Sequence, residues 1–159
     1  DFRLGGSLLC DALGQNGDNF PEIGDADYFI DCYEVVREFI EDRIAMSAVT
    51  VCDGGLLTAL KLMCSGDVGA EIDISGIKSA YGEDQNVRIL FSEVPGAILQ
   101  IKDSDYDYVD AELLLQDIAY YPAGHPVVGT GEVNVKTCGS GIANILQSLL
   151  GSQTSEGED

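Results

Sequence analysis

Apolar positions recur along the chain with two different periods, and each period predicts a type of element. Between Asp25 and Arg43 they recur every three or four residues, with acidic residues at the front and Arg43 at the end. This spacing predicts an amphipathic helix whose end charges suit the helix dipole. Similar spacing predicts helices over 56–65 and 106–118, and a short helix within 7–13.

Short apolar or β-branched runs predict strands, which alternate with these helices. The runs lie at 45–51, 68–74, 96–101 and 126–136, and Gly129-Thr130-Gly131 divides the last one in two. The polar stretch 75–88 predicts a connection with room for a helical turn. The alternation predicts an α/β (α+β) fold with a mixed sheet covered by helices.

The two ends of the sequence differ from its middle. Residues 1–24 are rich in Gly, Asn and Pro, which predicts an extended entry segment or linker arriving from a missing neighbour. Residues 25–138 form the predicted domain, and a chain of 159 residues is expected to build one core. Residues 139–159 predict a terminal helix followed by a flexible acidic tail. Because the sequence opens on Asp1, we expect it to be cut from a longer polypeptide or to be a processed chain.

The formal charge of the chain is −20, from 28 acidic and 8 basic residues. Nucleic acids and anionic membranes bind through cationic side chains, so neither is an expected partner. A bound phosphate would need backbone amides, a metal ion, or basic groups from elsewhere. No apolar run approaches the roughly 18 residues of a membrane-spanning helix.

The cysteines predict a reducing, cytoplasmic location. There are five, widely spaced and without a C-x-x-C pair, so no zinc or redox motif is expected. Each is expected to be a small buried residue.

The junction at 52–56, between a predicted strand and a predicted helix, carries the most chemical information. Gly54 and Gly55 leave the first amides of the helix open, and those amides together with the helix dipole favour an anion. The two glycines fit close packing of helix on strand equally well. Asp53 is placed to cap the helix. The segment Gly5-Gly6-Ser7 can offer similar groups, although a hinge is the favoured interpretation.

Two single residues are candidates for chemistry. Glu93 stands just ahead of an apolar strand, where its carboxylate faces either a cleft or solvent. His125 is the only histidine. Because no Ser or Cys nucleophile is identifiable as its partner, it is predicted to be a loop residue rather than a base.

In their order, four motifs resemble the C-terminal domain of the aminoimidazole ribonucleotide synthetase superfamily. They are Leu4-Gly5-Gly6-Ser7, Cys52-Asp53-Gly54-Gly55-Leu56-Leu57, Leu90-Phe91-Ser92-Glu93 and Gly96-Ala97-Ile98-Leu99-Gln100. Within it they most resemble the phosphoribosylformylglycinamidine synthase family, at the second synthetase-like repeat of its large single-chain form. The resemblance spans roughly residues 3–136.

The resemblance implies a function in purine biosynthesis. Enzymes of that family are ligases that convert formylglycinamide ribonucleotide to its amidine with ATP, magnesium and ammonia from glutamine. The resemblance implies that the segment alone binds no cofactor tightly and holds no metal. It also implies that a synthetase half-domain and a glutaminase complete the enzyme and supply the catalytic residues. The substrate or phosphate site it implies consists of Gly5, Gly6, Ser7, Asp53, Gly54 and Gly55, with Glu93 as a cleft candidate.

Departures from the family pattern keep other interpretations open. Val49, Thr50 and Cys52 stand where the family often has His-Asp and then Ser, which argues against catalysis by this copy and fits a repeat that keeps a structural nucleotide. One alternative is another ATP-dependent member of the superfamily, of the thiamine-phosphate kinase or selenophosphate synthetase type. The other alternative is a non-catalytic acidic interaction module whose partner covers the region around Tyr28, Phe29 and Tyr33.

Overall fold

The computed structural model describes residues 2–17 and 19–136. The helices within these ranges are α1 (Leu8–Ala12), α2 (Ala26–Glu41), α3 (Gly55–Met63), α4 (Ser75–Tyr81), α5 (Asn86–Phe91) and α6 (Tyr106–Leu115), with a 3-10 turn η1 (Asp103–Asp105). The strands are β1 (Ser47–Val51), β2 (Val68–Ile72), β3 (Gly96–Gln100), β4 (Gly124–Val128) and β5 (Val133–Val135). The tail predicted at 139–159 lies outside the described residues.

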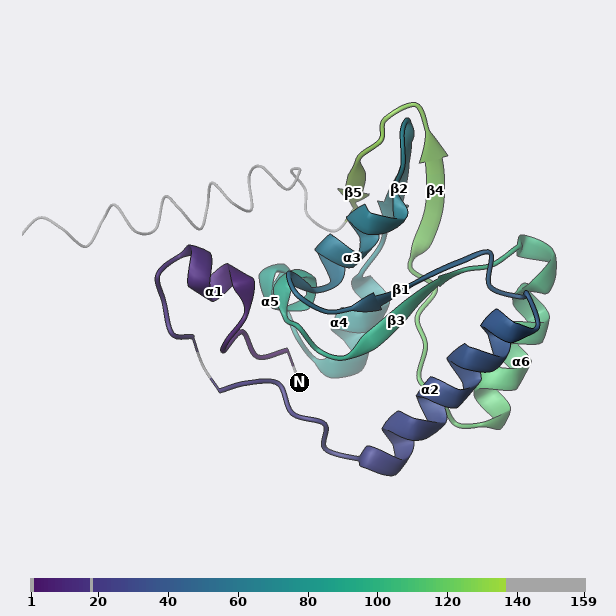
Figure 1. Cartoon of the computed structure of the whole chain (residues 1–159), viewed down its shortest axis with the longest axis horizontal. Helices are drawn as coiled ribbons and strands as arrows, with labels where there is room; N and C mark the ends of the chain where they lie inside the picture. The colour runs from purple at the N-terminus through teal and green to yellow at the C-terminus, as the bar shows by residue number, and fades with distance from the viewer. Residues whose placement is uncertain (1, 18, 137–159) are drawn as a thin grey trace, which may run out of the picture.

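The strands form two separate sheets. In one, β1 and β3 pair antiparallel, with Val49 opposite Ile98. In the other, β2 is central, antiparallel to β4 and parallel to β5. In Figure 1 the ribbon of β1 and β3 leads from the helices α3, α4 and α5 towards α2 and α6. Helices combined with a mixed sheet confirm the predicted α/β class.

The described residues bury two hydrophobic clusters, where the sequence predicted one core. The first joins α3 and α5 to β2 and β5, and its buried members are Leu57, Leu60, Ile72, Ile74, Ile89, Leu90, Val133 and Val135. The second lies between α2 and α6, and its buried members are Val35, Phe39, Val109, Leu113 and Ile118.

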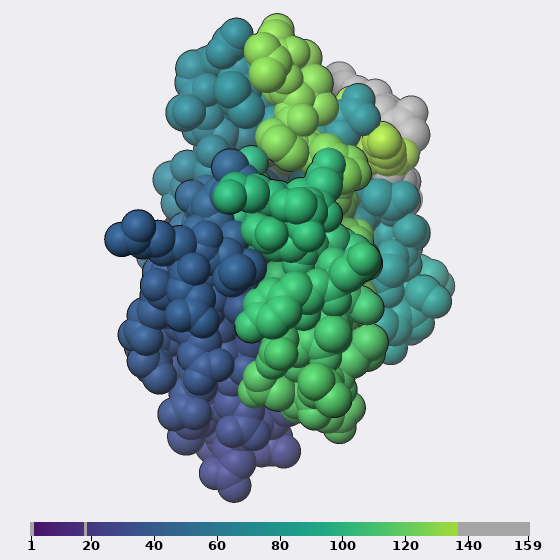
Figure 2. Space-filling model, turned by 90° about the vertical axis from the view of Figure 1, so that its right-hand side faces the viewer, coloured from purple at the N-terminus to yellow at the C-terminus, as the bar shows by residue number. Residues whose placement is uncertain are grey.

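Strand β3 separates the two clusters. Ile98 packs against the first cluster and Leu99 against the second. Successive side chains of a strand point to opposite faces, so neighbouring residues serve different cores. The space-filling view shows the faces of α2 and α6 side by side beneath the tip formed by β2 and β4 (Figure 2).

The polar stretch 75–88 differs most from its prediction, because it contains all of α4 and the start of α5. Each of these helices is too short to display the apolar repeat of a longer one. Ahead of α4, Asp73 Oδ1 accepts a hydrogen bond from the Ser75 N–H at 2.8 Å. Hydrogen bonds from the Ser75 hydroxyl and backbone lower the pKa of Asp73.

Two further residues lie where the sequence did not place them. His125 is on strand β4, opposite Glu71, and not in a loop. The adjacent Pro126 has no backbone N–H to donate. It is tolerated because β4 is an edge strand, with no neighbouring strand on its open side. Cys52 is exposed, unlike the buried Cys10. In the described part of the chain no helix has both the length and the apolarity to cross a membrane.

Candidate functional site

Helix α1 is fixed by Ser7, which is almost fully buried at 1% exposure. The Ser7 hydroxyl donates to the Leu4 carbonyl at 2.7 Å and accepts from the Cys10 N–H at 3.4 Å. Ser7 is thus the N-cap of α1. Gly6 has φ +70°, and a side chain there would collide with the ring of Phe20. The Gly5-Gly6-Ser7 segment is therefore a folded turn held by its own hydroxyl.

The turn between β1 and α3 is closed by the Gly55 N–H, which donates to the Cys52 carbonyl at 2.8 Å. Gly54 has φ 83° and ψ 2°, the third-position geometry of a type II turn, which favours glycine. Gly54, not Asp53, is the N-cap of α3, and no side chain caps this helix. The predicted capping by Asp53 is wrong because its exposed side chain precedes the cap position.

Gly55 lets α3 approach α5 closely. A Cβ at this residue would lie 2.7 Å from the carbonyl carbon of Phe91 and 2.8 Å from the carbonyl oxygen of Leu90. Its φ of +71° is also one that side chains rarely adopt. Of the two readings of this glycine pair, close packing thus has direct support at Gly55.

Glu93 joins the two glycine-containing segments. Its Oε1 accepts from the Gly54 N–H at 2.8 Å and from the Leu8 N–H at 2.9 Å. The preceding Ser92, 2% exposed, donates its hydroxyl to the Arg3 carbonyl at 2.6 Å. We call this arrangement of Arg3, Leu8, Gly54, Ser92 and Glu93 the Ser92–Glu93 junction.

The junction ties together the three distant segments that carry the nominated site residues, and of those residues Gly54 and Glu93 are bonded directly. It also assigns partners to the amides expected to meet an anion: Gly54 N–H donates to Glu93, and Gly55 N–H donates to Cys52. A carboxylate of the protein thus lies at the start of α3. Binding of substrate or phosphate by these residues stays a prediction.

Three residues near the junction escaped sequence reasoning. Ser92 belongs to the Leu90-Phe91-Ser92-Glu93 motif, but no local pattern indicates its hydrogen bond, because the partner is 89 positions away. Arg3 and Arg88 line a surface concavity of about 510 Å³ together with Gly17 and Asn19. Their signal was available, since a chain with only eight basic residues places Arg3 directly before the Leu4-Gly5-Gly6-Ser7 motif. Across residues 2–17 and 19–136, no three His, Cys, Asp or Glu side chains gather as metal ligands.

Fold and junction together define an α/β domain in which a glycine turn, an N-terminal segment and a carboxylate are tied into one unit. No protein-family model matches the chain. Curated proteins do match. The chain is 31% identical over 117 residues to a protein of Arabidopsis thaliana named probable phosphoribosylformylglycinamidine synthase, chloroplastic/mitochondrial, which covers 73% of this chain.

Two further relatives carry the same enzyme name. The phosphoribosylformylglycinamidine synthase of Schizosaccharomyces pombe is 32% identical and that of Homo sapiens 28%, each over 104 residues or 65% of this chain. The chain belongs to the phosphoribosylformylglycinamidine synthase family, as the counterpart of one segment. It spans only 7–8% of the length of these relatives. The predicted resemblance to the phosphoribosylformylglycinamidine synthase family is confirmed, and the alternative interpretations are not favoured.

Proposed function

We propose that the chain acts as one domain of a glutamine-dependent ligase that converts formylglycinamide ribonucleotide to its amidine. The similarity to three phosphoribosylformylglycinamidine synthases is the observation that carries this proposal. ATP and magnesium serve the whole enzyme, and the synthetase half-domain and glutaminase are the partners of this domain. We also propose a cytoplasmic location, which the free cysteines support.

The role of this domain is to shape a wall of the cleft. Phosphoryl transfer needs cations and positioned donors. The chain carries 28 acidic against 8 basic residues, which supports placing the reacting groups on the partner domains. The Ser92–Glu93 junction supports a positional role, because it fixes the glycine turn against the N-terminal segment. The segments that contain Gly5, Gly6, Ser7, Asp53, Gly54 and Gly55 then form the part of this wall nearest the phosphorylated substrate.

The test starts from the complete reading frame of the gene. We expect it to encode an ATP-binding synthetase half before this segment and a glutaminase with a cysteine nucleophile after it. The purified full-length product should form the amidine from formylglycinamide ribonucleotide, ATP, magnesium and glutamine, followed by chromatography. The 159-residue chain alone should form none.

Two results would contradict the proposal. One is a full-length product that makes no amidine while it remains folded. The other is tight binding of ATP with magnesium by the 159-residue chain alone, which would place the nucleotide machinery within it. The location is checked separately, by imaging the tagged full-length product.

A further inference from the structure

We infer that the concavity lined by Arg3, Gly17, Asn19 and Arg88 is an anion site that takes a phosphate or pyrophosphate group. We call it the arginine concavity. The assignment of this group to a phosphorylated substrate rests on the proposed function. The binding of phosphate in the concavity does not depend on that function. The inference moves the phosphate from the glycine amides to two guanidinium groups.

The geometry of the concavity comes from three segments. Arg3 lies in the N-terminal segment, Gly17 and Asn19 follow α1, and Arg88 belongs to α5. The volume of about 510 Å³ lies within the roughly 300–1,000 Å³ typical of small-molecule sites. An open concavity of this size has room for a phosphate and part of the molecule that carries it.

Two contacts hold the walls in place. The Arg3 carbonyl is anchored by the buried Ser92 hydroxyl. A Cβ on Gly17 would lie 2.7 Å from Cys10 Sγ and 3.0 Å from Gly5 Cα, so this loop is packed tightly on the N-terminal segment. Walls fixed in this way lower the cost of ordering the site when a ligand binds.

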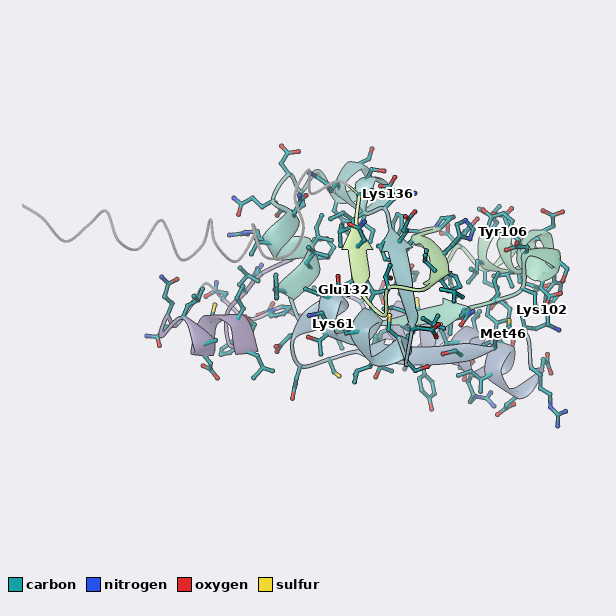
Figure 3. All side chains as sticks on the ribbon, turned by 90° about the horizontal axis from the view of Figure 1, so that it is seen from above. Met46, Lys61, Lys102, Tyr106, Glu132 and Lys136 are labelled. Carbon is teal, nitrogen blue, oxygen red and sulfur yellow. The ribbon has the colours of Figure 1, made fainter. Side chains whose placement is uncertain are left out.

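The charges of the chain make this position unusual. With a net charge of −20, most of the surface repels an anion. Lys61 on α3, Lys102 after β3 and Lys136 after β5 are well separated (Figure 3). On the exposed surface of α2, Arg37 pairs with Glu41. Two of the eight basic residues, Arg3 and Arg88, line the same concavity.

Guanidinium groups suit a phosphate for a specific reason. Each carries five N–H donors in a planar fork that matches two phosphate oxygens, and the Asn19 amide adds two more donors. Arg3 and Arg88 already interact within the protein, and a guanidinium with five N–H donors can serve more than one acceptor. The amides of Gly54 and Gly55 have one N–H donor each, and these N–H groups already donate to Glu93 and Cys52.

The test is a titration of the 159-residue chain with inorganic phosphate and with pyrophosphate, followed by calorimetry and by backbone amide NMR. We expect saturable millimolar binding, tighter for pyrophosphate, with shifts at the amides of Arg3, Gly17, Asn19 and Arg88. Arg88→Gln should weaken binding about tenfold, the loss of one charge-assisted pair. Arg37→Gln is the matched control: it removes the same charge on α2 and should leave binding unchanged.

Arg88→Lys keeps the charge and should retain part of the affinity, which guards against a glutamine variant that folds poorly. Absence of saturable binding in the unmodified chain overturns the inference. So does an equal loss in Arg37→Gln, which would mean general charge attraction, or shifts confined to Gly54 and Gly55. The two proposals can fail separately. If phosphate binds at the arginines but the full-length product makes no amidine, the proposed function is wrong and the anion site stands.

Discussion

At the scale of single residues, Glu93 links two distant segments, because one of its oxygens accepts hydrogen bonds from the Leu8 and Gly54 amides. Replacing Glu93 with Ala removes both hydrogen bonds. The free energy of unfolding should fall by about 1–3 kcal/mol, the usual range for bonds to a charged group that is partly exposed. Glu93→Gln keeps an acceptor but loses the charge, and should cost less. Denaturant unfolding followed by circular dichroism measures both.

The control for Glu93 is Glu34, an exposed residue of α2 for which no hydrogen bond or ion pair is described. Glu34→Ala removes the same charge and should change the free energy of unfolding by less than about 0.5 kcal/mol. If Glu93→Ala proved as harmless as Glu34→Ala, the junction would have no energetic role. In the full-length product, Glu93→Ala should also lower amidine formation.

Gly55 and Gly82 allow a matched comparison of two glycines with positive φ. Both lie near φ +60° to +71°, but a Cβ on Gly55 meets the backbone of Phe91, whereas one on Gly82 meets nothing within 4 Å. Gly82→Ala should cost about 1–2 kcal/mol from the backbone alone. Gly55→Ala adds a collision and should cost about 2–5 kcal/mol in total. Thermal unfolding of the two variants tests this, and equal losses would refute the packing of α3 on α5.

Sequence reasoning identified the residue types of the site but not their partners. Gly54, Gly55 and Glu93 were nominated from local patterns, yet the bond from Gly54 to Glu93 joins positions 39 apart. A local pattern contains no information on such a contact. The capping by Asp53 failed for the opposite reason, because the type II turn that displaces it depends on the precise φ of Gly54.

At the scale of elements, Asp25 and Asp53 both lie near the start of a helix, but only Asp25 caps its helix. Asp25 Oδ1 accepts from the Tyr28 N–H at 3.0 Å and is the N-cap of α2. Asp25→Ala should lower the free energy of unfolding by about 1 kcal/mol. Asp53→Ala, with equal charge loss beside α3, should cost under about 0.5 kcal/mol. Urea unfolding of both variants measures the difference, and a reversed order would return the cap to Asp53.

Periodicity found the long elements because each has enough turns to repeat. Helix α2 spans 16 residues and was predicted within two residues at each end. Helices α4 and α5, of 7 and 6 residues, were hidden in a polar stretch because less than two full turns leave no repeat to detect. Their burial comes from tertiary packing, as at Ile89 and Leu90 in the first cluster.

At the scale of the whole molecule, the division into two clusters follows from strand β3, and a count of apolar residues cannot reveal it. Ile98 and Leu99 read as one apolar run, and only the packed structure shows that they contact different clusters. The class of fold was predictable because it depends on the order of elements. The clusters were not, because they depend on how the elements pack.

The charge of the whole chain leads to a prediction about salt. A net charge of −20 destabilises the folded state through self-repulsion, and ions screen this repulsion. The screening length falls from about 30 Å at 0.01 M to about 10 Å at 0.1 M ionic strength. The described ion pairs, such as Lys136 with Glu71, are exposed and contribute little that salt can remove. The midpoint of thermal unfolding should therefore rise with NaCl, and rise equally with KCl at the same ionic strength. A midpoint that falls would show that attractive pairs, not repulsion, dominate the charge energy of this domain.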